Sequence, residues 1–242
     1  MKRIIYGVHP VTELLRTNPA SVIEVRYAEN SAATAEMLEL ARAAHVRCQK
    51  MERHAISRYA DTHEHQGVAA TAGEYRYCDQ SDILTAAGEA GEPPLIVALD
   101  NVQDPRNMGS IIRSAYLLGA HGVIFPKDRN TQVTAVVCKT SSGATEHIKL
   151  APVTNLARAL KELKDEGLWV VGTDMEEGRP HFQIDLKLPV VLVIGGEGEG
   201  MRNLTHKMCD FIATIPSRDA PFSFNASVAA SLLLGEAWRQ RH

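Results

Sequence analysis

The sequence predicts an α/β protein with a parallel sheet, preceded by a smaller α/β unit. From Leu95 onward, six short apolar runs alternate with segments of helical periodicity, which is typical of a parallel sheet covered on both faces. Residues 77–94, which contain two glycines and two prolines, separate this part from the first 76 residues. We therefore expect an N-terminal domain at 1–76, a linker with at most one weak helix at 77–94, and a larger domain at 95–242.

The first 76 residues are expected to form a compact unit. Val22–Tyr27 alternates between apolar and polar residues, as a half-buried strand does. Two further strands are expected at 46–51 and 66–71, and helices at 7–17, 32–44 and 52–59. This length lies within the usual range for a small domain.

The larger domain is expected to contain six strands. They are Leu95–Leu99, Gly122–Phe125, His147–Leu150, Leu168–Thr173, Val190–Ile194 and Phe211–Ile215. Helices are expected at 107–118, 132–141, 156–166, 201–209 and 226–239. The last of these is apolar or small on nearly every side, which predicts burial all round. A second subunit is a candidate for covering such a terminal helix.

Composition and charge exclude several classes of protein. The 242 residues are 45% hydrophobic and 23% charged, as in ordinary globular proteins. No apolar run reaches membrane-spanning length and the N-terminus lacks a signal-peptide core. The four cysteines have no paired spacing, which fits reduced thiols in a cytoplasmic protein. Because the net charge is −3, any nucleic-acid interface must be a local patch.

The stretch from Asp100 to Ala115 follows an apolar strand and runs into a helix. Residues at the carboxyl end of a parallel strand are where α/β folds carry their chemistry. Asn107 and Arg113 are the polar side chains that we single out here. The competing interpretation is a helix cap at Asn107 and a surface arginine at 113. For this stretch alone, the competing interpretation is the simpler one.

A second buried strand, Val190–Ile194, opens into a glycine-rich loop at 195–200. Glycine lets a backbone approach a ligand closely. The loop has no lysine and contains Glu197 and Glu199, which would repel a phosphate. A cationic ligand fits better, and the sulfonium of S-adenosylmethionine is one. A flexible turn is the alternative.

A third stretch joins the strand at 211–215 to the last helix. Ser223 and Asn225 stand just before that helix, so capping alone would explain either residue. Taken singly, none of the three stretches establishes a function.

In order and spacing, the three stretches together resemble the SpoU (TrmH) family of RNA ribose 2′-O-methyltransferases. The motifs are Asn-x-Gly-x-x-x-Arg from Asn107, Ile-Gly-Gly-Glu-Gly-x-Gly-Met from Ile194, and Ser-Phe-Asn-Ala-Ser-Val from Ser223. Two N-terminal segments, Tyr6-Gly-Val-His-Pro-Val and His65-Gln-Gly-Val-Ala, resemble the family's ribosomal-protein-like RNA-binding domain. The near-full-length coverage matches the members that methylate a guanosine of bacterial 23S rRNA.

The resemblance implies a SPOUT-type α/β knot and a homodimer packed through the knotted C-terminal region. It implies S-adenosylmethionine as the cofactor, no metal, and 23S rRNA as the partner, methylated in a loop of the peptidyl-transferase region. By motif, the catalytic set is Asn107, Arg113, Glu197, Ser223 and Asn225. The set that contacts the methyl donor is Thr173, Gly195, Gly196, Ile215 and Phe224. The turn at 217–222 departs from the family pattern, so the shape of the donor loop is left open.

Methyl transfer to a ribose hydroxyl requires positioning and the removal of one proton. Arginine holds its proton too tightly to be a convenient base. We therefore expect Arg113 to stabilise the 2′-oxygen, Glu197 to orient Arg113, and an RNA phosphate to be a candidate proton acceptor. Two alternatives stay open, methylation of tRNA and a non-catalytic RNA-binding protein of the same fold. His63 and His65 suggest a metal only weakly, because no spaced ligand motif accompanies them.

Overall fold

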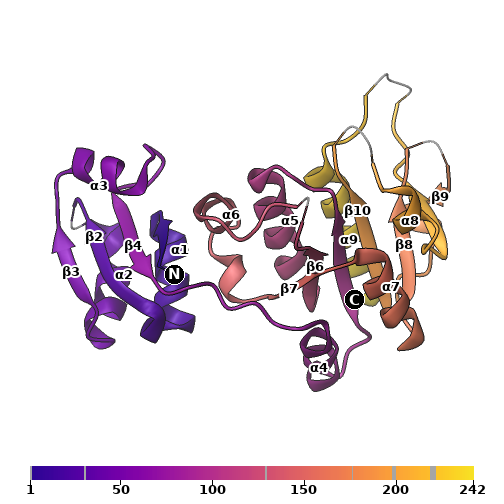
Figure 1. Cartoon of the computed structure of the whole chain (residues 1–242), viewed down its shortest axis with the longest axis horizontal. Coiled ribbons are helices and arrows are strands. Elements are labelled where there is room, and N and C mark those ends of the chain that lie inside the picture. Colours follow the sequence, from indigo (N-terminus) through magenta and orange to yellow (C-terminus); the bar gives the residue numbers. More distant parts are fainter. Residues whose placement is uncertain (1, 30, 129, 176, 198–199, 219–221) are drawn as a thin grey trace. The chain divides into compact units, whose positions relative to one another are not determined.

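The computed structural model describes residues 2–29, 31–128, 130–175, 177–197, 200–218 and 222–242 (Figure 1). The chain forms two compact units. The first contains residues 1–76 and 133–147, and the second contains 77–132 and 148–242. In the described part of the chain, no helix has the length and apolar character needed to cross a bilayer.

The first unit is built on a four-stranded sheet in the order β1-β4-β2-β3. The strands are β1 (Arg3–Tyr6), β2 (Val22–Tyr27), β3 (Arg47–Lys50) and β4 (Val68–Ala72). Strand β4 runs antiparallel to both β1 and β2, and β2 and β3 are parallel. Strand β1 was not predicted from the sequence, because four residues are too short for a clear alternation. Pairing with β4, as at Ile5 opposite Ala70, places it in the sheet.

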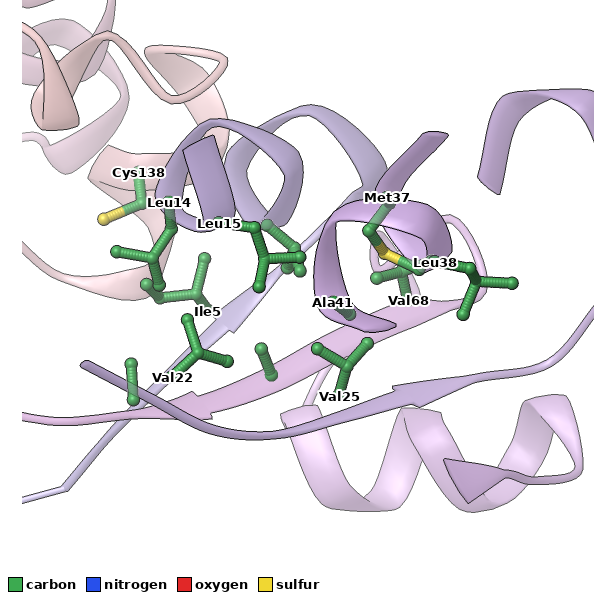
Figure 2. Close-up of a cluster of buried hydrophobic side chains, with 13 residues drawn as sticks. Ile5, Leu14, Leu15, Val22, Val25, Met37, Leu38, Ala41, Val68 and Cys138 are labelled. Carbon is green, nitrogen blue, oxygen red and sulfur yellow. The ribbon is translucent and has the colours of Figure 1, made fainter. Parts of the chain in front are cut away.

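Helices cover both faces of this sheet. The helices α1 (Val8–Thr17) and α2 (Ala32–Ala43) pack on one face with the main core cluster (Figure 2). The apolar side chains of α1 at Val11, Leu14 and Leu15 are all buried. The helix α3 (Arg53–Ala60) packs its buried Ile56 against the other face, beside Ala69. The short 3-10 turn Pro19–Ser21 precedes β2.

The segment 133–147 belongs to the first unit by its contacts, although the sequence places it far from residues 1–76. It contains α6 (Ala135–Thr140) and the 3-10 turn Ala144–Glu146. Cys138 of α6 lies in the core cluster near Leu14 (Figure 2). Arg3 binds the Glu146 carboxylate at 3.2 Å and lies 4.8 Å from the centre of the Tyr75 ring. These contacts make α6 part of the core of the first unit.

The second unit is built on a parallel sheet in the order β7-β6-β5-β10-β8-β11-β9. Its strands are β5 (Leu95–Asp100), β6 (Gly122–Pro126), β7 (Lys149–Val153), β8 (Trp169–Thr173), β9 (Arg179–Pro180), β10 (Val190–Gly195) and β11 (Phe211–Thr214). The sheet therefore has seven strands, and the prediction of six was wrong. The additional strand, β9, is only two residues long and contains a proline. It pairs with Ala213 and Thr214 of β11 at the sheet edge, the position that tolerates proline.

Helices pack on both faces of the sheet. The helices are α4 (Gln80–Ala90), α5 (Pro105–Leu117), α7 (Leu156–Asp165), α8 (Asn203–His206) and α9 (Ala226–Arg241). The buried side chains of α7 join Val191 and Val193 of β10 in one core cluster. Residues 192 and 194 point to the opposite face because side chains alternate along a strand. Helix α9 packs with α5 and contacts β10. The segment 77–94 carries α4, whose Ile83 is fully buried in the α7 cluster.

Helix α9 is buried on one side only within this chain. Leu233 and Leu234 are almost completely buried, whereas Val228, Leu232 and Trp238 are 39–44% exposed. The expectation of burial all round therefore fails for the single chain. An apolar stripe of α9 stays accessible to solvent.

Candidate active site

The three sequence motifs meet at one edge of the seven-stranded sheet, where the strands end. Asp100 is the last residue of β5 and lies level with Gly195, the last residue of β10. On the next strands along, Thr173 of β8 lies level with Ala213 of β11. The carboxyl ends of parallel strands all face the same side, so the loops that follow them converge.

Helix α5 begins beside this edge, and Asp104 caps it. The Asp104 carboxylate accepts a hydrogen bond from the Arg106 backbone N–H at 2.8 Å, and Pro105 occupies the first helical position. The interpretation of Asn107 as the cap is therefore wrong. Asn107 lies inside the first turn, is 7% exposed, and is free to use its amide elsewhere.

The Glu197 carboxylate joins the three motifs. The Asn107 amide donates a hydrogen bond to its Oε1, and the Asn225 amide donates to the same oxygen at 3.3 Å. One carboxylate oxygen thus holds the start of α5, the loop after β10 and the start of α9 together. Hydrogen bonds to an ionised acceptor are among the stronger ones in proteins, so this junction fixes the relative position of the three segments.

Asn225 has two functions in this arrangement. Its side-chain oxygen caps α9 by accepting hydrogen bonds from the backbone N–H of Ser227 at 2.9 Å and from the Ser227 hydroxyl at 2.7 Å. Because the oxygen is used in this way, the amide nitrogen faces Glu197. The capping interpretation of Asn225 is therefore correct, and its role in a functional site stays a prediction.

Asp100 and Arg202 form an ion pair that was not predicted from the sequence. The fully buried Asp100 carboxylate accepts hydrogen bonds from the Arg202 backbone N–H at 2.8 Å and from Nε at 2.6 Å, with Nη2 at 2.5 Å. The pair anchors the far end of the glycine-rich loop to the end of β5. An aspartate closing an apolar strand is a signal for a buried partner, but nothing in the sequence indicates that the partner follows 102 positions later.

The surrounding backbone leaves no room for a side chain at positions 195 and 196. A β-carbon at position 196 would lie 2.0 Å from the Asn101 carbonyl oxygen, and one at position 195 would lie 2.6 Å from the Gly200 carbonyl carbon. The loop folds back on itself through a bridge between Gly196 and Gly200. Positions 198 and 199 of this loop, including the acidic residue Glu199, lie outside the described residues.

Arg113 lies on α5, six residues after Asn107, and its side chain is exposed. Six residues rotate a helix by about 240° from the starting direction, so the two residues face different ways. Among the residues that the structure describes, no hydrogen bond or ion pair joins Arg113 to Glu197. The partners of Glu197 are instead Asn107 and Asn225.

The residues expected to contact a methyl donor lie at the same sheet edge. Thr173 and Gly195 end the neighbouring strands β8 and β10, and Ile215 follows β11 directly. The Thr173 hydroxyl donates a hydrogen bond to the Val193 carbonyl at 3.1 Å and so ties β8 to β10. Ser223 and Phe224 are exposed just before α9, with Phe224 43% exposed.

The structure shows the surroundings of His65, one of the two histidines whose spacing suggested a metal only weakly. Both ring nitrogens of His65 are engaged, since Nδ1 accepts from the Gly67 backbone N–H and Nε2 lies 2.9 Å from the Ser57 hydroxyl. Across the described ranges, no three His, Cys, Asp or Glu side chains group closely enough to hold a metal ion.

Comparisons with known proteins agree with this geometry. Residues 94–235 match the SpoU rRNA Methylase family, and residues 4–78 match the family described as RNA 2′-O ribose methyltransferase substrate binding. The 23S rRNA (guanosine-2′-O-)-methyltransferases RlmB of Ralstonia nicotianae and Pseudomonas aeruginosa are each 40% identical to this chain. They align over 99% and 98% of it, respectively, and over 96% of their own length.

A solved structure shows the same fold. The SpoU methyltransferase AviRb from Streptomyces viridochromogenes, in complex with the cofactor AdoMet, superposes with a TM-score of 0.83 and 27% identity. The alignment covers 99% of this chain and 90% of AviRb. Because a family model covers more than half of the sequence and relatives at 40% identity cover nearly all of it, this chain belongs to the SpoU rRNA methylase family.

Proposed function

We propose that this protein transfers the methyl group of S-adenosylmethionine to the ribose 2′-hydroxyl of a guanosine in the peptidyl-transferase region of 23S rRNA. The observation that carries the proposal is the junction at Glu197. Three segments far apart in sequence bring Asn107, Glu197 and Asn225 together at the carboxyl edge of the sheet. Relatives at 40% identity over nearly the whole chain are named 23S rRNA (guanosine-2′-O-)-methyltransferases.

The residues at the sheet edge fit a cationic methyl donor. When bound, S-adenosylmethionine supplies a methyl group already activated on a sulfonium. Thr173 and Gly195 end neighbouring strands and Ile215 follows β11, so all three offer backbone groups there, with Gly196 and Phe224 on the adjoining loops. The loop after β10 carries an acidic side chain and no lysine, which suits a cation rather than a free phosphate.

In the proposed mechanism, Arg113 stabilises negative charge on the ribose 2′-oxygen. A guanidinium stays protonated at neutral pH and can contact the hydroxyl and a neighbouring phosphate together. Its exposed side chain is accessible to RNA. Asn107, Glu197 and Asn225 hold the surrounding segments, and Ser223 contributes a hydroxyl next to them. An RNA phosphate is the proposed acceptor of the ribose proton.

We extend the proposal to the architecture. Residues 1–76 bind the RNA substrate, and residues 77–94 join the two parts of the chain while packing α4 on the second unit. Residues 95–242, of which 133–147 pack in the first unit, form the methyltransferase domain with an α/β knot at its C-terminal part. A homodimer forms through that region in the cytoplasm. Support for the dimer comes from apolar side chains exposed on two neighbouring helices, Tyr116 and Leu117 of α5 together with Val228, Leu232 and Trp238 of α9.

The decisive experiment is a radiolabelled methyl-transfer assay. Purified protein is incubated with labelled donor and with 23S rRNA or bulk tRNA from a strain that lacks the gene, and the labelled nucleotide is mapped by mass spectrometry. We expect label on a guanosine 2′-O in 23S rRNA. Label on tRNA alone would select the tRNA alternative, and no label on either RNA would favour a non-catalytic RNA-binding protein.

A further inference from the structure

A groove on the first unit lies between α3 and the turn that leads into β4. Its volume is about 660 Å³, and it is lined by Glu52, Arg53, His54, Ser57, Arg58, His63 and His65. Helix α3 is labelled in Figure 1. None of the residues at the carboxyl edge of the seven-stranded sheet lines this groove.

The local sequence explains why polar side chains gather here. Ile56 turns inward and is fully buried, so the rest of α3 presents its other faces outward. Arg53 and Ser57 are four residues apart, as are His54 and Arg58, so two neighbouring rows of the helix face the groove. The chain then leaves α3 through Asp61, which has a φ of 50°, and returns to β4 at Gly67, which has a φ of 78°.

His65 forms the floor of the groove in a defined hydrogen-bonding state. It is 1% exposed, and its Nδ1 accepts the Gly67 backbone N–H at 2.9 Å. The ring proton therefore lies on Nε2, which donates to the Ser57 hydroxyl oxygen at 2.9 Å. Burial and the nearby charges of Arg53, His63 and Lys139 lower the pKa of His65, which keeps it neutral. The Ser57 hydroxyl in turn donates its proton to the Arg53 backbone carbonyl at 3.3 Å.

The two arginines of the groove have no acidic partner in the described part of the chain. Both side chains are exposed, and neither forms an ion pair or hydrogen bond among those residues. Three other arginines of the same unit are paired, Arg3 with Glu146, Arg16 with Glu13, and Arg26 with Glu24. Glu52 is the only carboxylate among the described residues that line the groove, so two guanidinium groups face one carboxylate there.

We propose that this groove binds the phosphodiester backbone of the substrate RNA. The guanidinium groups of Arg53 and Arg58 contact phosphates. Guanidinium groups suit phosphate because their donors are arranged in a planar fork. The inference rests on the proposed RNA-binding function of residues 1–76 and names the surface that performs it. Contacts of this kind position an RNA without reading its sequence.

The test measures binding rather than turnover. An unmodified transcript of the peptidyl-transferase region of 23S rRNA is titrated with full-length protein by fluorescence anisotropy between about 0.05 and 0.2 M salt. For Arg53→Ala/Arg58→Ala, we expect the Kd to rise about tenfold or more and the salt slope to fall by about 1.5, the scale for two lost phosphate contacts. Ser57→Ala should leave the salt slope unchanged, because the hydroxyl carries no charge and its removal releases no counterion.

The matched control is Arg42→Ala/Arg47→Ala, which removes the same charge from exposed positions on α2 and β3 of the same unit. It should change the Kd by less than about threefold. Equal losses of RNA affinity in the two double variants, or wild-type RNA affinity in Arg53→Ala/Arg58→Ala, would overturn the proposal. Thermal unfolding and calorimetry of donor binding check that each variant is folded.

Two further measurements identify the ligand of the groove and distinguish RNA binding from catalysis. Inorganic phosphate at millimolar concentration should compete weakly with the transcript. A polyglutamate that displaces the RNA from wild-type protein but not from the double variant would assign the groove to acidic proteins and contradict the proposal. If wild-type protein binds the transcript as described but methylates neither RNA, the proposed catalytic function fails while the groove assignment stands.

Discussion

Asp100 and Arg202 hold the glycine-rich loop against the end of β5. The carboxylate is completely buried and receives the backbone N–H of Arg202 as well as its guanidinium. The loop that it anchors carries Glu197, the residue that joins α5 to α9. This pair therefore supports the position of the candidate site without belonging to it.

Removal of Arg202 should be costly because it leaves a buried carboxylate without a partner. For Arg202→Ala we expect a loss of about 3 kcal/mol in the free energy of unfolding, within the range for a broken buried ion pair. Urea denaturation measures it. The control is Arg158→Ala, whose partner Glu162 is solvent-exposed and which should cost about 0.5 kcal/mol. Similar losses in both variants would argue against a special role for the Asp100 pair.

Substitutions at Asn225 should separate its cap from its contact with Glu197. Aspartate caps helices as well as asparagine does, so Asn225→Asp should retain the stability of α9. It would place a second carboxylate 3.3 Å from the Glu197 oxygen, and we expect turnover to fall by about a hundredfold. Urea denaturation and methyl-transfer kinetics measure the two effects. Unchanged turnover in Asn225→Asp would remove this contact from the mechanism.

Gly196 should be irreplaceable because of its closeness to the Asn101 carbonyl. A β-carbon there would overlap backbone atoms at 2.0 Å, so Gly196→Ala must displace the loop that holds Glu197. We expect donor binding by calorimetry to become undetectable. Gly88→Ala is the matched control, since a β-carbon at that position would meet nothing within 4 Å and alanine favours a helix. Normal donor affinity in Gly196→Ala would contradict the loop geometry.

The first unit should lose stability in mild alkali through Cys138. Burial raises the pKa of this thiol from 9.0 to about 11. A group whose pKa is raised by folding contributes fully below its unfolded pKa and loses that contribution as the pH rises. We therefore expect the free energy of unfolding to fall by about 2–3 kcal/mol between pH 9 and 11. Urea denaturation of wild-type protein and Cys138→Ala should show a stability difference that narrows over this range, and parallel pH profiles would contradict it.

The sequence predicted those elements whose signal is local. The apolar strands β5 and β10 could be found from their apolar runs, and the start of α9 at Ala226 from periodicity. The strand β9 could not, because two residues that contain a proline have no period and depend on their partner in β11. The cap of α5 was assigned to Asn107 because the sequence alone could not show that Asp104 faces the first free N–H.

For the candidate site too, the sequence predicted some features and only the fold shows the others. Motif order identified Asn107, Glu197 and Asn225, but only the fold shows that one carboxylate oxygen receives both amides. The pairing of Asp100 with Arg202 spans 102 positions and follows from the adjacency of β5 and β10. Long-range contacts of this kind are properties of topology, so no local pattern could have indicated them.

The role of Arg113 provides the most direct test of the proposed mechanism. If this residue stabilises the developing 2′-alkoxide, it acts in the transition state and hardly in donor binding. Arg113→Ala should then lower single-turnover methylation of a 23S rRNA fragment by about a hundredfold or more. Arg113→Lys should fail almost as badly, because a point charge cannot reproduce a two-pronged contact.

The measurement pairs single-turnover methylation of the fragment with calorimetry of S-adenosylmethionine binding in the same preparations. We predict a collapse of the methylation rate in both Arg113 variants, with donor affinity within a few-fold of wild type. Near-normal methylation by Arg113→Ala would show that Arg113 is only an exposed residue of α5 and would contradict the proposed mechanism.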